Sequence, residues 1–189
     1  KAHVQSYGAH TAVLVKLLDA GERLTIQVHP DRIFAKERFG SPFGKTEAWY
    51  VVGGRQIDGE EPYVLLGFRP GVTAQMWNEL FDKQDIDGMI GPAPHSRREG
   101  EVYLVEGGVP HAIGPGCFLI EIQEPTDYTP RTERRTPRGR PVPERACHQG
   151  LGFEAMLECF HCDSFTLEEA SGASRRRLSS GRTAAPRRF

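Results

Sequence analysis

Short runs of alternating apolar and polar residues, separated by turns rich in glycine and proline, recur along most of this chain. Alternation with a period of two is typical of β-strands. We therefore predict strands at residues 12–18, 23–29, 46–52, 61–68, 101–106 and 117–123. The 21 glycines and 14 prolines also favour a turn-rich β protein over a helical bundle. A mainly β barrel or sandwich is the expected fold.

Only one segment has a convincing amphipathic helical pattern, residues 73–84, with Thr73 placed as its N-cap. Its apolar residues are Met76, Trp77, Leu80 and Phe81, which fall at helical spacing and predict a core-facing stripe. A second, shorter helix or irregular excursion is expected at residues 31–39, ending at Gly40.

Composition narrows the class of protein. The 189 residues suffice for one domain, or for one domain and a fragment of another, and 38% hydrophobic with 26% charged residues is ordinary for a globular protein. A net charge of −1 argues against a general nucleic-acid role, and neither a membrane span nor a signal-peptide pattern is evident. Four cysteines are too few for a disulfide scaffold, so we expect a reduced, cytoplasmic protein.

Four polar residues stand at positions where a fold could bring them together. Gln27 and His29 are two apart on a predicted strand, so their side chains would share a face. Glu47 begins a later predicted strand, and His111 lies on a glycine-framed turn just before another. Imidazole, carboxylate and amide oxygen together suit zinc or a similar divalent ion, which needs three or four converging donors. The sequence thus predicts a metal site.

The spacing of these residues follows two patterns. One runs Gly21, five residues, Gln27, one residue, His29, and the other runs Gly100, five residues, Glu106, one residue, Gly108, two residues, His111. Both resemble the paired motifs of the cupin barrels, with Gln27 where the first usually has His and Glu106 where the second usually has Pro. That resemblance implies a cupin-type jelly-roll barrel with one or two short helices.

Three separated stretches, LTIQVHPD, GKTEAWYV and VPHAIG, resemble the type I mannose-6-phosphate isomerases in the right order. The resemblance runs from residue 12 to about residue 134. It implies one zinc ion per chain, held by Gln27, His29, Glu47 and His111. It also implies a sugar-phosphate substrate and interconversion of mannose 6-phosphate with fructose 6-phosphate through an enediol.

The same resemblance extends to the segment EIQEPTDYTPRTER. It matches Glu121, Asp127 and Arg131 to acidic and arginine positions of the family, and Lys45 to a substrate-contacting lysine. We expect Arg131 to be the catalytic arginine, because a guanidinium can stabilise an enediolate without losing its proton. Glu121 is expected to act as an acid/base or to orient a neighbour, and Asp127 and Lys45 to contact substrate.

Composition shifts divide the rest of the chain. We predict a metal-binding domain at 1–134, an Arg- and Pro-rich linker at 135–150, a partial second cupin domain of strand character at 151–170, and a disordered basic tail at 171–189. On this interpretation the chain is a truncated family member, and a homodimer could protect a bare sheet edge.

Three alternatives stay open from sequence. The chain could be a non-catalytic metal-binding cupin, either a regulatory or storage relative or an inactive truncated isomerase. Cys159 and Cys162, with His161 between them and Cys147 and His148 nearby, could hold a second zinc, although buried thiols fit this single pair better. The basic tail could bind nucleic acid or a membrane surface, but without interleaved aromatic residues it predicts no specific recognition.

Overall fold

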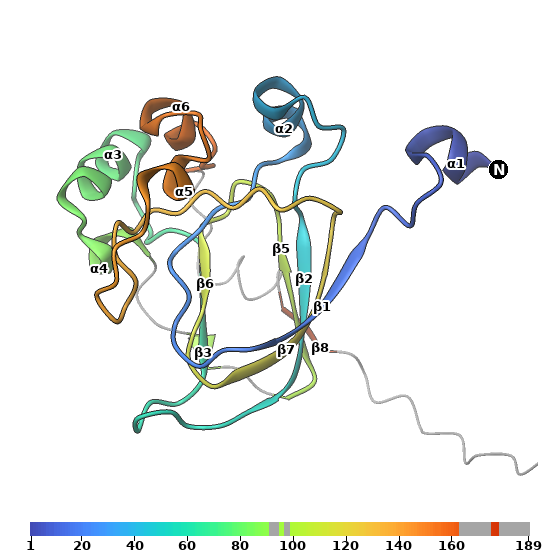
Figure 1. Ribbon diagram of the computed structural model, residues 1–189. Coiled ribbons are helices and arrows are strands. Elements are labelled where there is room, and N and C mark those ends of the chain that lie inside the picture. Colours follow the sequence, from blue (N-terminus) through green and yellow to red (C-terminus); the bar gives the residue numbers. More distant parts are fainter. Residues whose placement is uncertain (91–94, 97–98, 163–174, 178–189) are drawn as a thin grey trace, which may run out of the picture.

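The computed structural model describes residues 1–90, 95–96, 99–162 and 175–177. Two antiparallel sheets face each other, and most of the helices gather at one end of them (Figure 1). The larger sheet has the strand order β1-β7-β2-β5-β8 and the smaller one β4-β3-β6. The strands are β1 (Leu14–Asp19), β2 (Glu47–Gly54), β3 (Tyr63–Leu66), β4 (His95–Ser96), β5 (Glu101–Val105), β6 (His111–Ile113), β7 (Cys117–Gln123) and β8 (Arg175–Arg177).

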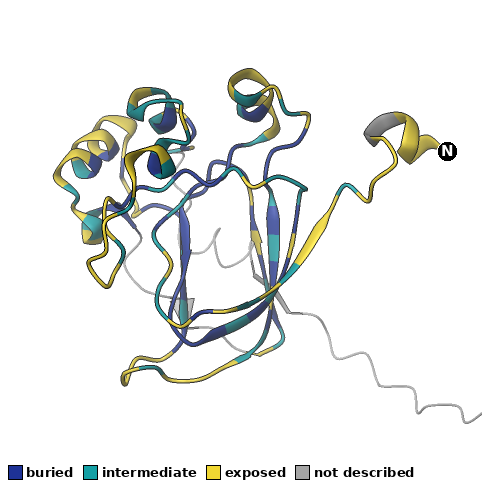
Figure 2. Ribbon diagram, viewed as in Figure 1, coloured by how far each residue is buried: buried dark blue, intermediate teal, exposed yellow. Residues whose placement is uncertain are grey.

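Strand alternation builds the core between these sheets. On β2, Glu47, Trp49 and Val51 are buried, and Trp49 pairs with Tyr103 of β5 and Glu121 of β7. Trp49 and Val51 meet apolar side chains of β3 and β6 in one hydrophobic cluster. Figure 2 shows buried residues along the strands of both sheets. The prediction of a mainly β fold is confirmed.

The helices are α1 (Ala2–Tyr7), α2 (Arg32–Phe39), α3 (Ala74–Lys83), α4 (Ile86–Met89), α5 (Glu144–His148) and α6 (Phe153–Leu157). As predicted, Thr73 caps α3 by accepting a hydrogen bond from the Met76 N–H. Trp77 and Phe81 are buried, but Met76 is 47% exposed, so the predicted stripe is narrower by one residue. None of the helices in the described parts is long and apolar enough to cross a membrane.

The outer face of the larger sheet is apolar. Along β1, Val15 and Leu17 are 64% and 69% exposed, and they pair with Ile122 and Ile120 of β7. An antiparallel sheet with one solvated face normally presents polar residues there. The strand β1 also lies at the edge of its sheet, and Figure 2 shows it as largely exposed.

Residues 23–29 do not form the predicted strand. They are extended, and Gln27 makes isolated bridges with His111 on one side and Arg131 on the other. The Glu133 carboxylate holds this segment by accepting two hydrogen bonds of 2.7 Å from Arg23 and one of 2.5 Å from the Ile26 N–H. Alternation is thus preserved without a regular ladder, because the partner segment at 130–132 is itself irregular.

Strand character at residues 151–170 is also a wrong prediction where the structure describes them. Phe153–Leu157 is helix α6, and residues 163–170 lie outside the described residues. Met156 and Phe160 pack into the same cluster as Trp77 of α3 and Phe68. The physical reason is the spacing of the apolar residues, which suits one helical face as well as a strand.

Parts of the predicted linker and of the predicted tail form helix or strand. Within the Arg- and Pro-rich segment, Cys147 of α5 is buried and its carbonyl accepts a hydrogen bond of 2.9 Å from the Arg131 N–H. In the predicted tail, Arg175–Arg177 forms β8, which pairs with β5, whereas 171–174 and 178–189 lie outside the described residues. The division into domains stays a prediction.

Replacing Phe160 with alanine tests whether residues after 150 belong to the hydrophobic cluster that contains Trp77 and Phe68. Phe160 lies 4.7 Å from Trp77 and 6.1 Å from Phe68 between ring centroids, so its loss leaves a cavity. We expect the free energy of unfolding in urea to fall by about 3–5 kcal/mol. The control Met76→Ala, at an exposed position of α3, should cost less than about 1 kcal/mol. Equal effects of the two substitutions would contradict this packing.

Candidate metal centre

Backbone pairing places the first and last predicted ligands side by side. The Gln27 N–H donates to the His111 carbonyl at 3.0 Å, and the His111 N–H donates back to the Gln27 carbonyl at 2.9 Å. On the other side, the Val28 N–H donates to the Pro130 carbonyl at 3.0 Å. The segment that carries Gln27 and His29 is therefore held between β6 and residues 130–132.

Three of the four predicted ligands converge in the interior. His29, Glu47 and His111 are all buried, and one potential ligand atom from each lies within 4.8 Å of the others. The nearest Glu47 oxygen lies 3.1 Å from His29 Nε2, and the other lies 3.6 Å from His111 Nε2. No other group of three such residues was found among the described residues.

Contacts behind these side chains orient them toward a common point. His29 Nδ1 lies 2.9 Å from the Tyr128 carbonyl, and His111 Nδ1 lies 2.9 Å from the Val109 carbonyl. Each imidazole can therefore donate from Nδ1 and leave Nε2 as the inward ligand atom. The Trp49 indole N–H donates to Glu47 Oε1 at 2.8 Å and fixes the carboxylate. This arrangement fits a borderline divalent ion.

Gln27 completes the group, with its amide 3.2 Å from His111 Nε2. The amide nitrogen lies nearest to the ring, and a flip of the amide brings Oε1, the atom that binds cations, to the same place. Gln27 is only partly buried, unlike the other three. It therefore forms the side of the site that faces solvent.

Lys45 lies within the ligand group. Its ammonium is 2.6 Å from His29 Nε2 and 2.9 Å from Glu47 Oε2, and the residue is only 3% exposed. A cation thus already contacts two of the atoms that would hold a metal ion. That contact supports the fit, because it shows that the group attracts positive charge. Lys45 is therefore a buried lysine, although it lies in the loop before β2.

The charges of the site keep the carboxylate ionised and one imidazole neutral. Burial alone would raise the pKa of Glu47, but the hydrogen bond to His29 and the charges of His29, His111 and Lys45 lower it overall. Burial, reinforced by the charge of His29, lowers the pKa of His111 to about 3. Metal ligands must be deprotonated, so both shifts favour binding at neutral pH.

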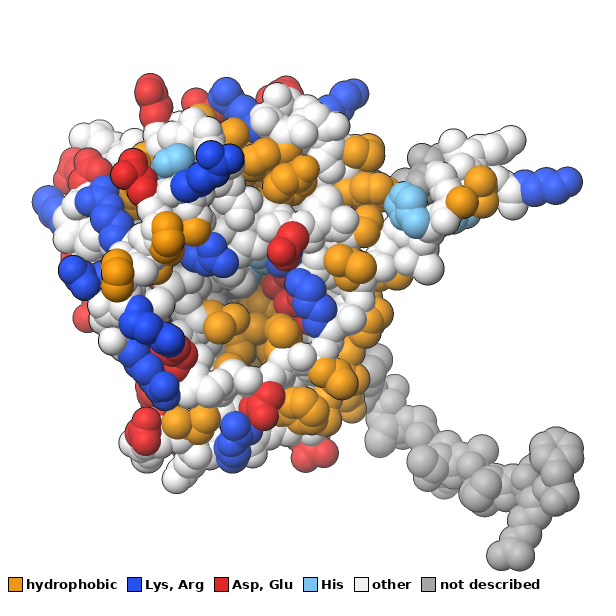
Figure 3. All heavy atoms as spheres, in the orientation of Figure 1, with side chains coloured by type: hydrophobic (Ala, Val, Ile, Leu, Met, Phe, Trp, Pro, Cys, Tyr) orange, Lys and Arg blue, Asp and Glu red, His pale blue; other side chains and the backbone are white. Residues whose placement is uncertain are grey.

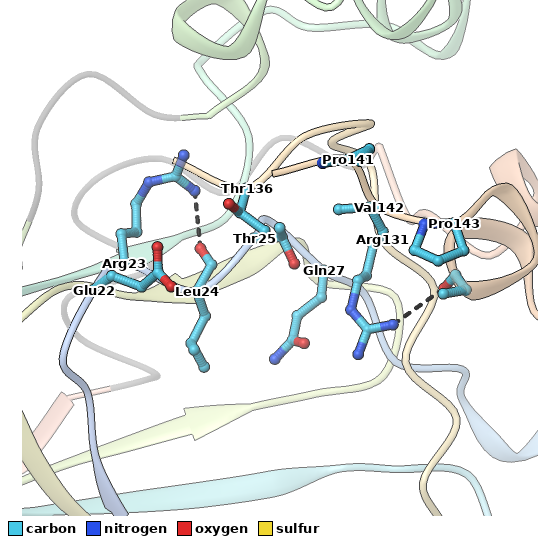
Figure 4. A pocket seen from close by; sticks show the side chains of 11 residues that line it. Glu22, Arg23, Leu24, Thr25, Gln27, Arg131, Thr136, Pro141, Val142 and Pro143 are labelled. Atoms are coloured by element: carbon cyan, nitrogen blue, oxygen red, sulfur yellow. Dashed lines mark hydrogen bonds between the residues drawn. The ribbon is translucent and has the colours of Figure 1, made fainter. Parts of the chain in front are cut away.

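A cavity of about 380 Å³ opens beside Gln27, and Arg131 lines it. Figure 4 shows both side chains pointing into it, with the Arg131 guanidinium donating to the Ala146 carbonyl at 3.2 Å. The surface in Figure 3 is hollowed in the middle of the face seen in Figure 1, with apolar side chains inside and charged ones around the rim. Of the four candidate ligands, Gln27 is the one that lines this cavity.

Comparison with known proteins gives a consistent relationship. No family model matches the chain. It is 34% identical over 143 residues to a mannose-6-phosphate isomerase of Streptococcus mutans, and 32% identical over 119 residues to a probable mannose-6-phosphate isomerase of Bacillus subtilis. These alignments cover 72% and 63% of this chain. In sequence and fold, this region is homologous to part of the mannose-6-phosphate isomerases.

Solved structures of mannose-6-phosphate isomerases share the fold. The enzyme of Bacillus subtilis superposes with a TM-score of 0.65 at 26% identity, covering 81% of this chain and 45% of that one. A zinc-bound mannose 6-phosphate isomerase superposes with a TM-score of 0.62 at 15% identity, covering 89% and 58%. These neighbours confirm the predicted cupin-type fold. The chain spans only about 40% and 36% of the length of the two sequence relatives.

Of the other residues matched to the mannose-6-phosphate isomerases, Glu121 lies inside and Asp127 outside. Glu121 is buried opposite Trp49 on β7, and its Oε1 accepts no hydrogen bond among the described residues. The Lys16 ammonium lies 3.3 Å from that oxygen. Asp127 has a side chain that is 89% exposed and lies 3.8 Å from the same ammonium.

Sequence reasoning missed Lys16 and Gln123. The Lys16 ammonium donates to Gln123 Oε1 at 2.6 Å, and Gln123 is buried in register with Glu47. One sequence feature could have indicated Lys16, because it is the charged residue at an inward position of a strand otherwise rich in Val and Leu. The alternative of a second zinc site at the cysteines gains no support, since Cys147, Cys159 and Cys162 belong to no metal-ligand group among the described residues.

Replacing Lys45 with methionine tests the competition between its ammonium and a metal ion. Without metal, the variant leaves the buried Glu47 carboxylate without its nearest cation, so the melting temperature should fall. With zinc, the ion supplies that charge, so the rise in melting temperature on adding zinc should exceed that of the unchanged protein. Calorimetry at matched zinc concentrations measures both. As a control, Lys83→Met on the surface of α3 should alter neither value; a smaller zinc shift in Lys45→Met would contradict the idea.

Proposed function

We propose that this chain carries the metal centre and catalytic face of a zinc-dependent isomerase that interconverts mannose 6-phosphate and fructose 6-phosphate. The observation that supports it best is the convergence of His29, Glu47 and His111, from three separate motifs, with both Nε2 atoms directed inward. Relatives named as mannose-6-phosphate isomerases supply the substrate class. Because the chain spans less than half of those relatives, activity itself is part of the proposal.

The metal would be held by Gln27, His29, Glu47 and His111. When bound, zinc would supply Lewis-acid polarisation of sugar oxygens. Zinc is favoured over magnesium or calcium because two of the four ligands are imidazoles, which hard cations bind poorly.

Interconversion of these sugars requires three further functions. A base must remove the C2 proton of the aldose and return a proton to C1 while a proton passes from O2 to O1, a positive group must stabilise the enediolate oxygens, and cationic groups must hold the phosphate. We assign the positive group to Arg131, whose guanidinium lines the cavity beside Gln27 and, among the described residues, makes one hydrogen bond, to a carbonyl. A guanidinium keeps its charge throughout such a cycle.

Proton transfer is assigned to Glu121. Its buried oxygen without a hydrogen bond, 3.3 Å from the Lys16 ammonium, suits a carboxylate that accepts a proton from substrate. Lys45 is proposed to donate to a sugar oxygen once the metal displaces its ammonium from His29. Asp127 is proposed to contact substrate from the exposed rim, where its carboxylate lies 3.8 Å from Lys16.

The remaining partners follow from the substrate. A metabolic sugar phosphate and four cysteines without disulfides agree with the proposed cytoplasmic location. The homodimer and the lack of specific nucleic-acid binding stay predictions.

Zinc dependence is tested by measuring fructose 6-phosphate formed from mannose 6-phosphate. Treatment with a chelator should abolish turnover, and zinc, but not magnesium, should restore it. Metal analysis should give one zinc per chain. A chain that binds one zinc and shows no turnover would favour the alternative of a non-catalytic metal-binding cupin, and two zinc ions per chain would revive the cysteine site.

The role of Arg131 is tested by Arg131→Lys, which keeps the charge but loses the planar, forked donors. We expect kcat to fall by about 100-fold or more, with zinc affinity unchanged, because a preorganised donor to developing charge acts on the transition state. Arg55→Lys, at an exposed position paired with Asp19, is the matched control and should retain full kcat. A lysine variant with normal kcat would remove Arg131 from the mechanism.

A further inference from the structure

Residues 158–161 follow α6 and contact the loop before β6 through His161, and we call them the strap. Cys159 and Phe160 anchor it, since both are buried in the cluster that contains Trp77. Glu158 forms an ion pair with Arg38 of α2. The strap thus joins the helical end of the molecule to the loop between β5 and β6.

That loop is tied to the other ligand segment by one short hydrogen bond. The Gly108 N–H donates to the carbonyl of His29 at 2.7 Å. Gly108 lies three residues before His111, so this bond fixes the separation of the two ligand-bearing segments. The carbonyl of Gly108 in turn accepts a hydrogen bond of 3.0 Å from the His161 N–H of the strap.

The His161 ring closes the arrangement from outside. It lies directly on Gly108, where an added Cβ would come within 2.3 Å of the ring Cγ. Its Nε2 is 3.3 Å from Asp31 Oδ2, two residues after His29. The other oxygen of Asp31 accepts the Phe34 N–H at 2.7 Å and caps α2. One side chain therefore contacts both ligand segments at once.

We propose that His161 is a positioning residue for the metal centre, which sets the spacing of His29 and His111 by clamping Gly108 against the segment 29–31. The proposal rests on the metal centre described above but not on isomerase activity. It assigns a role to a residue 50 positions beyond the last candidate ligand, in a stretch whose described residues form no metal-ligand group. Contacts of this kind orient ligands and typically change metal affinity by about 10–100-fold.

Zinc affinity is the deciding measurement, obtained by competition with a chromophoric chelator at a temperature where every metal-free variant is folded. His161→Ala removes the ring and its contact with Asp31, and we expect zinc affinity to fall by about tenfold. His161→Phe keeps a ring over Gly108 and should retain part of that affinity. His3→Ala, in α1, is the matched control and should bind zinc like the unchanged protein.

A double-mutant cycle separates positioning from a general loss of stability. Gly108→Ala inserts a methyl group where the His161 ring lies, so it should weaken zinc binding more in the unchanged protein than in His161→Ala, by about threefold or more. Gly108 also has a φ of +88°, which disfavours alanine in both backgrounds equally. Gly59→Ala, with a φ of +81° and no atom within 4 Å of the added Cβ, controls for that strain.

The outcomes are distinct. The positioning role alone would be overturned by either of two results, provided that the unchanged protein binds one zinc. One is a His161→Ala variant whose zinc affinity is within twofold of the unchanged protein, and the other is a double-mutant cycle that shows no coupling. An unchanged protein that binds no zinc would overturn both this proposal and the proposed function. Weakened binding with coupling to Gly108 would support His161 whether or not the chain turns over sugar phosphate.

Discussion

The buried carboxylate of Glu47 is the group on which the arrangement of the site depends. A charge placed between two sheets is tolerated only when it is paired and hydrogen-bonded. Here the Lys45 ammonium and the Trp49 indole N–H donate to it, and the Nε2 atoms of His29 and His111 lie 3.1 and 3.6 Å from its oxygens. Each of these partners comes from a separate stretch of sequence or an inward position of the same strand. The need to satisfy Glu47 therefore fixes where those segments lie.

The two hydrophobic clusters support different segments around the Glu47 carboxylate. The cluster between the sheets surrounds Trp49, which holds the carboxylate from behind. The cluster at the helical end contains Ile26 and Val28, on either side of Gln27, together with residues of α3 and α6. One cluster thus supports Glu47, and the other supports the segment that carries Gln27 and His29. The candidate metal ligands lie where these two clusters meet.

Much of this arrangement could be predicted from sequence, because strand alternation and motif order are local or ordered along the chain. The inward positions of β2 and β7 and the capped helix at Thr73 follow from such patterns. Alternation at Gln27 and His29 was a sound guide even though no regular strand forms. The apolar residues Phe153, Met156, Leu157 and Phe160 stand at helical spacing. The sequence therefore favours a helix there as well as the predicted strand.

Other features depend on tertiary contacts that no local pattern contains. Nothing around Lys45 indicates that its ammonium turns inward, since that follows from the position of His29 in the fold. The burial of Cys147 within an Arg- and Pro-rich stretch, and the contact of His161 with Gly108, likewise join residues far apart in sequence. Such contacts depend on how the folded segments lie against one another.

The reciprocal pairing of Gln27 with His111 has a consequence for folding kinetics. It joins residues 84 positions apart, so the ligand group is complete only after a long stretch of chain has been closed into a loop. A metal ion can bind tightly only to that late, nearly native arrangement. Its stabilisation would then be absent from the folding transition state and appear mainly as slower unfolding. A bound metal ion would thus slow unfolding of the native protein and have little influence on the folding rate.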